Sequence, residues 1–142
     1  MERVLAIDFG RRRIGLAISD ELGVMANGLP TLNVRNKKQA IDSVVEVIEE
    51  QLPSQIIIGL PLNLDGTRSE MALVVEDFAE TLKPIFDIPI GLIDERLTSV
   101  AAHRTMRDMG VKQKDNKGKV DQLAAVYLLE IFLQQQREMP TD

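Results

Sequence analysis

Acidic residues stand at the ends of two apolar runs of this 142-residue chain and at the start of its last helical segment. Asp8 closes the first apolar run, the pair Asp94 and Glu95 follows a later one, and Asp121 lies in the first turn of the last helical segment. A carboxylate at the rim of a sheet is costly unless a cation shares its site. Carboxylates gathered together repel one another, and divalent cations remove that repulsion. The pattern therefore predicts a metal site built from acidic side chains.

The composition narrows the chemistry of such a site. The chain has no cysteine and a single histidine, His103, which excludes thiolate zinc sites, thiol nucleophiles and histidine-rich metal centres. Carboxylate oxygens favour magnesium or manganese. Two such ions about 4 Å apart can activate a water molecule and stabilise the leaving oxygen when a phosphodiester bond is hydrolysed.

Each acidic residue also has a purely structural interpretation. Asp8 could cap a turn, Asp94 and Glu95 could be solvated, and Asp121 could favour the start of a helix through the helix dipole. The joint placement of these acids in one order of strands favours the shared site over three unrelated structural roles. His103 is interpreted as a surface residue rather than a general base.

Three strands and a helix are predicted for the first part of the chain. The strands cover about residues 3–8, 13–19 and 24–34, the last broken by Asn27-Gly28 and Pro30. Their links are too short for a parallel crossover, so these strands must be antiparallel neighbours. Asn36 is expected to cap the helix with Gln39 as its capping-box partner, and Pro53 to end it. The expected apolar stripe of this helix is Ile41, Val44, Val45, Ile48 and Leu52.

Strands and helices alternate in the rest of the chain. Residues 55–60 are a continuous apolar run, which predicts a strand buried on both faces, and a loop over 60–67 follows. The next elements are a helix capped by Ser69 and ended by Pro84, and a strand over 88–93. A short helix (98–107), a polar basic loop (108–118) and a last helix (119–137) complete the prediction.

This order predicts an α/β fold: a five-stranded mixed sheet, with three antiparallel strands followed by two parallel ones, flanked by helices. Ligands of such sheets bind beyond the carboxyl ends of the strands, which directs Asp8 and the Asp94/Glu95 pair to the same rim. Asp121 shares a helical stripe with Ala124 and Ala125, whose small side chains would let that helix approach the sheet closely. We expect a single domain over 1–138 and a tail over 139–142.

Charge distribution indicates the partner. The net charge is −5, yet nine of the 17 lysines and arginines fall in two short stretches, 11–13 and 103–119. A local basic field favours contact with phosphates whatever the total charge, although solvated loops would give the same pattern. The residues proposed to bind substrate are Arg13, Asn63, Arg96, Thr98, Lys117 and Lys119. Arg13 and Arg96 could instead form ion pairs, Thr98 could cap a helix, and Asn63 and Thr67 could close a turn.

Four motifs resemble those of the YqgF family, also called RuvX, in that family's order and over nearly the whole chain. They are Asp8-Phe9-Gly10 with Arg13-Ile14-Gly15-Leu16-Ala17-Ile18-Ser19-Asp20, Ile58-Gly59-Leu60-Pro61-Leu62-Asn63 with Asp65-Gly66-Thr67, Asp94-Glu95-Arg96-Leu97-Thr98, and Val120-Asp121-Gln122-Leu123-Ala124-Ala125. The resemblance implies a ribonuclease H-like fold and a metal-dependent nuclease of the bacterial cytoplasm that matures the 5′ end of pre-16S ribosomal RNA. It also implies that Asp8, Glu95 and Asp121 are the catalytic and metal-binding acids.

One departure from the related RuvC resolvase concerns the fourth strand. This strand ends Ile58-Gly59-Leu60-Pro61, without the glutamate that the resolvase carries there. An acid at the end of the fifth strand would have to replace it. Glu95 is preferred to Asp94 for its longer reach, and the sequence leaves the choice between them open.

Three functions follow from these observations. The first is a nuclease that uses two magnesium or manganese ions on structured RNA, with 11–13 and the basic loop 111–119 gripping the backbone and ribosomal particles as possible partners. The second is a Holliday junction resolvase, which needs a dimer for paired cuts. The third is a non-catalytic nucleotide- or phosphate-binding module. We expect a cytoplasmic protein without a membrane span, either a monomer or a weak homodimer. No dimer surface is obvious, although Ile131, Phe132 and Leu133 could give the last helix apolar surface on more than one face.

Overall fold

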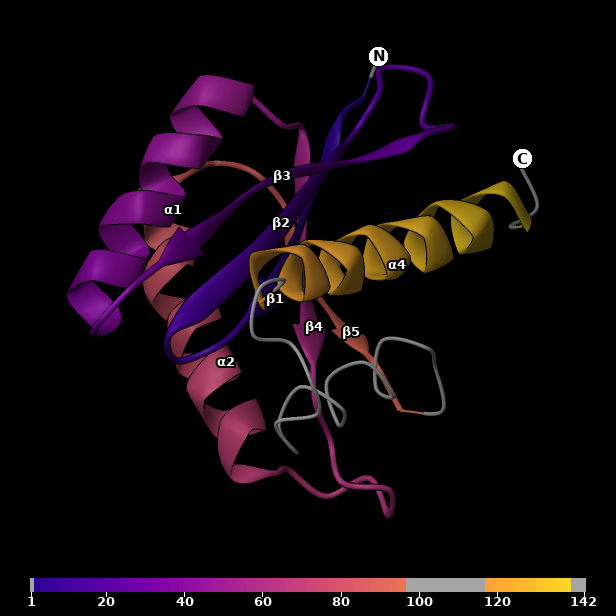
Figure 1. Ribbon diagram of the computed structural model, residues 1–142. Helices are drawn as coiled ribbons and strands as arrows, with labels where there is room; N and C mark the ends of the chain where they lie inside the picture. The colour runs from indigo at the N-terminus through magenta and orange to yellow at the C-terminus, as the bar shows by residue number, and fades with distance from the viewer. Residues whose placement is uncertain (1, 97–116, 139–142) are drawn as a thin grey trace.

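The computed structural model describes residues 2–96 and 117–138, with the backbone alone at 117–120. Its strands and helices follow one another along the chain much as predicted (Figure 1). The strands are β1 (Val4–Phe9), β2 (Arg13–Ser19), β3 (Ala26–Asn33), β4 (Gln55–Leu60) and β5 (Ile90–Asp94). The helices are α1 (Lys37–Gln51), α2 (Glu70–Leu82), the 3-10 turn η1 (Lys83–Ile85) and α4 (Lys117–Glu138).

All five strands form one mixed sheet in the order β3-β2-β1-β4-β5. β1 pairs antiparallel with β2, and β2 with β3, while β4 is parallel to both β1 and β5. The predicted arrangement of three antiparallel strands followed by two parallel ones is confirmed. The lengths of the links explain it, because only the connections through α1 and α2 are long enough to return the chain in parallel.

Helices cover both faces of the sheet (Figure 1). α1 and α2 lie on one side, and α4 crosses the other. Alternation along β1 divides the core accordingly: Leu5, Ile7 and Phe9 pack on the α1 and α2 side, and Val4 and Ala6 pack on the α4 side. β1 therefore lies at the centre of the molecule, with all six of its residues buried.

Polar side chains cap the helices as predicted, with two differences in α1. Asn36 Oδ1 accepts a hydrogen bond from the Gln39 N–H at 2.8 Å. The Gln39 side chain reaches one residue further back than in a capping box, because it accepts from the Arg35 N–H at 2.7 Å. Leu52 is not part of the buried stripe: it ends the helix in the left-handed region at φ 51° and is 76% exposed. Ala40 is buried in that stripe instead.

β3 runs without the predicted interruption. It is an edge strand, and an edge tolerates a proline because one side of its backbone needs no ladder partner. The pairing slips by one residue near Pro30, since Leu29 lies opposite Leu16 and Leu32 opposite Ile14. A bulge therefore accommodates the proline where the sequence predicted a break.

Two element boundaries differ from the prediction in the second half of the chain. β5 begins at Ile90, after Pro89 rather than before it. α4 begins at Lys117, so the last residues of the predicted basic loop are helical. The predicted helix 98–107, the rest of that loop and the tail 139–142 lie outside the described residues, as do Thr98 and His103.

The apolar residues near the end of α4 serve the core of the chain itself. Phe132 and Leu133 are buried against the sheet, and Ile131 packs against the same cluster. Phe132 and Leu133 are therefore not available for a dimer surface on α4. None of the helices in the described part of the chain is both long and apolar enough to cross a bilayer.

Candidate active site

Asp8 is the one charged residue in the otherwise apolar β1. It is fully buried, and the alternation of the strand directs its side chain to the face that α4 covers, the side of Val4 and Ala6. Two glycines flank it in the sheet. Gly15 on β2 is its paired residue, and Gly59 on β4 comes next after the pair Ile7 and Ile58. The sheet therefore has no side chains on either side of Asp8.

Asp121 reaches this place because α4 packs directly on Gly15. A Cβ at Gly15 would overlap the carbonyl oxygen of Asp121, so only glycine allows this approach. Ala124 and Ala125 are buried next to it, as the predicted stripe of small residues requires. Since α4 begins at Lys117, Asp121 lies beyond the first turn, where a helix dipole has little influence. Its complete burial thus needs another explanation.

Glu95 occupies the space above the second glycine. A Cβ at Gly59 would overlap the carboxylate of Glu95, which is only 1% exposed. Asp94 lies on the other face of the chain from Glu95 and is exposed, and its carboxylate accepts a hydrogen bond from the Arg96 side chain. Ile93 packs in the α4-side cluster, so Glu95, two residues later, lies on the same side as Asp8. The structure thereby brings Glu95, and not Asp94, to the buried acids.

An arginine accompanies the acids. Arg13 Nε donates to Asp121 Oδ2 at 2.7 Å, and about a quarter of the Arg13 side chain remains exposed, 27%, against none of Asp121. Arg13 begins β2, two residues before Gly15, so the sheet presents its guanidinium directly to the helix. Arg13 therefore forms an ion pair, as the alternative interpretation of this residue expected.

The donor set suits a hard divalent cation, because three buried carboxylates, with neither sulfur nor imidazole, surround the two glycines. They do not form a ready-made cage. Within 2–96 and 121–138, no three acidic or histidine side chains are grouped closely enough to hold an ion. Asp121 directs one oxygen to Arg13 instead. The residues fit a metal by their chemistry, and the carboxylates would have to draw together around it.

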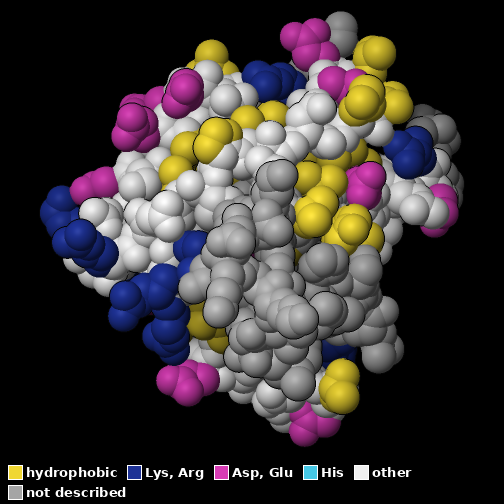
Figure 2. All heavy atoms as spheres, in the orientation of Figure 1, with side chains coloured by type: hydrophobic (Ala, Val, Ile, Leu, Met, Phe, Trp, Pro, Cys, Tyr) yellow, Lys and Arg dark blue, Asp and Glu magenta, His cyan; other side chains and the backbone are white. Residues whose placement is uncertain are grey.

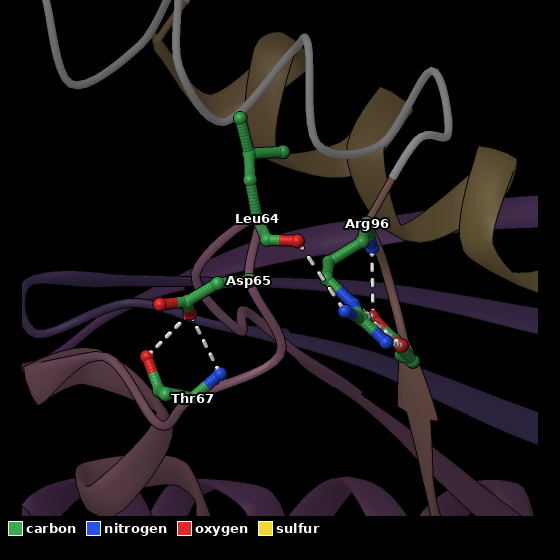
Figure 3. Close-up of polar contacts among 5 residues, drawn as sticks. Leu64, Asp65, Thr67 and Arg96 are labelled. Atoms are coloured by element: carbon green, nitrogen blue, oxygen red, sulfur yellow. Dashed lines mark hydrogen bonds and ion pairs between the residues drawn. The ribbon is translucent and has the colours of Figure 1, made fainter.

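A tight loop between β4 and α2 borders the acids. Asn63 Nδ2 donates to Thr67 Oγ1 at 2.9 Å, and Thr67 Oγ1 donates to Asp65 Oδ1 at 2.6 Å. Gly66 completes the turn at φ +89°, a conformation that favours glycine. Figure 3 shows Arg96 reaching back to this loop, where its guanidinium donates to the Leu64 carbonyl at 3.4 Å.

Hydrogen bonds within this loop shift the titration of its acids. The Thr67 hydroxyl and then the Thr67 N–H lower the pKa of Asp65. The side chain and then the N–H of Arg96 lower the pKa of Asp94. Both carboxylates stay ionised well into acid, so the loop is held together by charge-assisted hydrogen bonds at neutral pH.

Thr67→Val is expected to raise the pKa of Asp65 towards the ordinary value of about 3.9, because the hydroxyl donor is removed and the shape is kept. A lowered folded-state pKa stabilises above the unfolded pKa, and that stability is lost as pH falls through the folded pKa. The stability that the Thr67 hydroxyl gives the wild-type protein over Thr67→Val should therefore be lost in acid. Carboxyl NMR titration of Asp65 checks this. Thr81→Val removes a hydroxyl that donates to the Asp77 carbonyl and should leave the titration of Asp65 unchanged. An unmoved pKa of Asp65 in Thr67→Val would contradict the assignment.

The structure shows where the proposed substrate residues lie and does not test whether they bind substrate. Arg13, Asn63 and Arg96 make contacts within the chain: Arg13 with Asp121, Asn63 with Thr67, and Arg96 with Asp94. Lys117 and Lys119 lie in the first turn of α4, where only the backbone is described. Sequence reasoning did not assign a role to Gly15 and Gly59. Both glycines stand in the motifs that resemble the family, but only the observed register of the sheet places them beside Asp8.

A family match covers almost all of this arrangement. The family described as "RuvX: Holliday junction resolvase" matches residues 2–135, which include both glycines and all three acids. The chain belongs to the RuvX family. Among its relatives is a protein of Koribacter versatilis named "Putative pre-16S rRNA nuclease", 43% identical over 141 residues, 97% of this chain and 92% of that protein. A protein of Chloroflexus aurantiacus with the same name is 41% identical over 137 residues, 96% of this chain and 90% of that one.

Solved structures agree with the fold of this RuvX chain. RuvC of T. thermophilus, in complex with a Holliday junction substrate, superposes with a TM-score of 0.57 over 96% of each chain at 16% identity. The sequence resemblance to the family and the predicted ribonuclease H-like sheet are both confirmed.

Proposed function

We propose that this protein is a metal-dependent nuclease that hydrolyses phosphodiester bonds in the maturation of pre-16S ribosomal RNA. One observation supports this above all: three carboxylates from β1, the end of β5 and α4 are buried around two glycines at one rim of the sheet. Buried charges are rarely retained unless they are paired or bind a cation. The names of the relatives supply the reaction and the substrate.

The cation would be held by Asp8, Glu95 and Asp121. Mg²⁺ or Mn²⁺ suits such oxygen donors, and two ions are proposed because one can serve the attacking water and the other the leaving oxygen. The chain itself supplies the burial that strengthens these interactions and the arginine that balances Asp121. Arg13 is exposed enough to meet a phosphate as well.

RNA is the favoured substrate, and junction DNA is the second candidate. The relatives at about 40% identity are named for pre-16S ribosomal RNA, whereas the family description and the structural neighbour name the Holliday junction. Two features favour RNA. The fourth strand ends Ile58-Gly59-Leu60-Pro61, without the glutamate that RuvC carries at that strand end, and two of the three apolar residues considered for a dimer surface, Phe132 and Leu133, are buried within the chain. Such a reaction would take place in the cytoplasm, on ribosomal precursor particles.

The test compares purified protein on two substrates, a precursor RNA with the 5′ extension of 16S ribosomal RNA and a four-way DNA junction. Each is incubated with Mg²⁺, with Mn²⁺ and with a chelator. We expect metal-dependent cleavage of the RNA and little cleavage of the junction. Symmetric cutting of the junction with intact RNA would favour the resolvase, and an absence of cleavage on both would contradict a nuclease that acts unaided.

A further inference from the structure

A basic site lies on the face of the sheet opposite the acids. A cavity of about 290 Å³ opens between the β1–β2 turn, the start of α1 and the side of α2. Phe9 and Phe78, whose ring centroids are 4.5 Å apart, belong to its apolar floor. Arg11, Arg12, Arg35 and Lys37 stand around it, all four exposed. Figure 2 shows lysine and arginine side chains gathered on the left of the view, over the start of α1 and this turn.

The charge of this cavity is only partly balanced. Its lining contains one acid, Asp77, which pairs with Lys37 at 2.7 Å. Arg11 pairs with Glu70 at 3.3 Å through largely exposed side chains, an interaction of little strength. The guanidinium groups of Arg12 and Arg35 form no ion pair or hydrogen bond with any residue whose side chain the structure describes. Two guanidinium groups thus remain available at the mouth of one cavity.

The arrangement opposes the stability of α1. Anionic side chains are favoured at the start of a helix, yet the first turn of α1 contains no acid, and Arg35 and Lys37 flank its cap. Adding Arg11 and Arg12 from the neighbouring turn brings four like charges together. The ion pairs with Asp77 and Glu70 offset only part of this charge, and a sequence that departs from a local rule often does so at a functional site. An external anion would relieve this repulsion.

The cavity also adjoins the acids along the chain. Phe9 on its floor directly follows Asp8, and the two side chains point to opposite faces of β1. The turn that carries Arg11 and Arg12 continues to Arg13, which bonds Asp121. A strand of nucleic acid that passes over the β1–β2 turn from the acids would therefore meet this cavity next.

We infer that this cavity binds a backbone phosphate of the nucleic-acid substrate, with Arg12 and Arg35 as the principal contacts. The inference rests on the proposed function for the identity of the ligand. Guanidinium groups suit it, because they bind phosphate oxygens in pairs through a planar fork of donors. The site would hold the substrate on the face of the sheet opposite the acids. It would thereby fix which phosphodiester bond reaches the acids.

The test measures binding of a single-stranded RNA oligonucleotide to the full chain in the presence of a chelator, over a series of salt concentrations. The variant is Arg12→Gln combined with Arg35→Gln. We expect about tenfold weaker binding at moderate salt. The slope of log K against log salt should become shallower by about 0.7 for each phosphate that the protein no longer neutralises. The same oligonucleotide sequence as DNA should be weakened equally, because the phosphate is shared.

The matched control removes the same charge elsewhere, with Lys83→Gln combined with Arg137→Gln, two exposed residues outside the cavity. The inference is overturned if the test variant and this control bind the RNA equally well. If the test variant loses affinity for RNA but not for DNA, the recognised group is not the phosphate. The melting temperature of the test variant should stay the same or rise, since it relieves repulsion near α1; a clear fall would indicate a structural role instead.

Binding without metal also separates this inference from the proposed nuclease. If the protein cleaves RNA and the test variant binds like the control, the cavity alone is refuted. If no substrate is cleaved but the test variant shows reduced affinity and salt dependence, the phosphate site stands and the nuclease does not.

Discussion

Asp8→Asn should reduce cleavage of the precursor RNA on the order of 10³-fold or more while leaving RNA binding nearly unchanged. Asparagine keeps the size of the side chain and removes the negative charge at the centre of the buried acids. A bound cation contributes several kcal/mol of charge stabilisation to hydrolysis, and each 1.4 kcal/mol corresponds to a factor of about ten in rate. Single-turnover cleavage with saturating Mg²⁺, together with binding in chelator, measures both quantities.

The control for this prediction is Asp87→Asn, an exposed acid just before β5. It makes the same change of charge outside the site and should cleave like wild type. Normal cleavage by a folded Asp8→Asn protein would contradict the assignment of Asp8, Glu95 and Asp121 to a metal site. Thermal unfolding of each variant shows whether a loss of activity reflects a loss of structure.

Gly59→Ala should remove most of the activity with little loss of stability. The new methyl group would overlap the carboxylate of Glu95, which is the mobile end of a long side chain and can move away. Leu128, the next neighbour, would be at 3.4 Å, close to an ordinary contact. We expect cleavage to fall about 10–100-fold, as for other disturbed metal sites, and the free energy of unfolding by about 1 kcal/mol or less.

Two other glycines provide the comparison. Gly91→Ala on β5 meets no atom within 4 Å and should leave cleavage and stability near wild type. Gly15→Ala meets the backbone of Asp121 and must push α4 off the sheet, so it should cost roughly 1–3 kcal/mol of stability together with activity. Equal behaviour of Gly59→Ala and Gly91→Ala would show that the position of Glu95 does not matter for cleavage.

Much of the fold is visible in the sequence because the links between its elements are decisive. Short links forced the first three strands to be antiparallel, and the segments around α1 and α2 were long enough for parallel returns. The prolines at 53 and 84 marked helix ends within a few residues. The exception was Pro30, where an edge strand absorbed the proline through a bulge that the local sequence does not reveal.

The structure was needed to choose between Asp94 and Glu95 as the buried acid. Side-chain reach favoured Glu95, but only the alternation along β5, set by Ile93 in the core, directs Glu95 inward and Asp94 outward. The cavity beside α1 could not be predicted. The antiparallel pairing predicted for 13–19 and 24–34 brings Arg12 close to Arg35, but nothing in the spacing indicates that α2 closes a cavity beside them.

The bond between Arg13 and Asp121 has a consequence for how the molecule is assembled. A carboxylate this deeply enclosed needs a counter-charge, and the chain provides one itself, at 2.7 Å. Docking of α4 therefore need not wait for an ion to arrive. Folding and cation binding would then be separate events. A chelator should abolish the proposed nuclease activity without unfolding the protein. With the metal site proposed above, activity would follow the free concentration of the cation rather than the amount of folded protein.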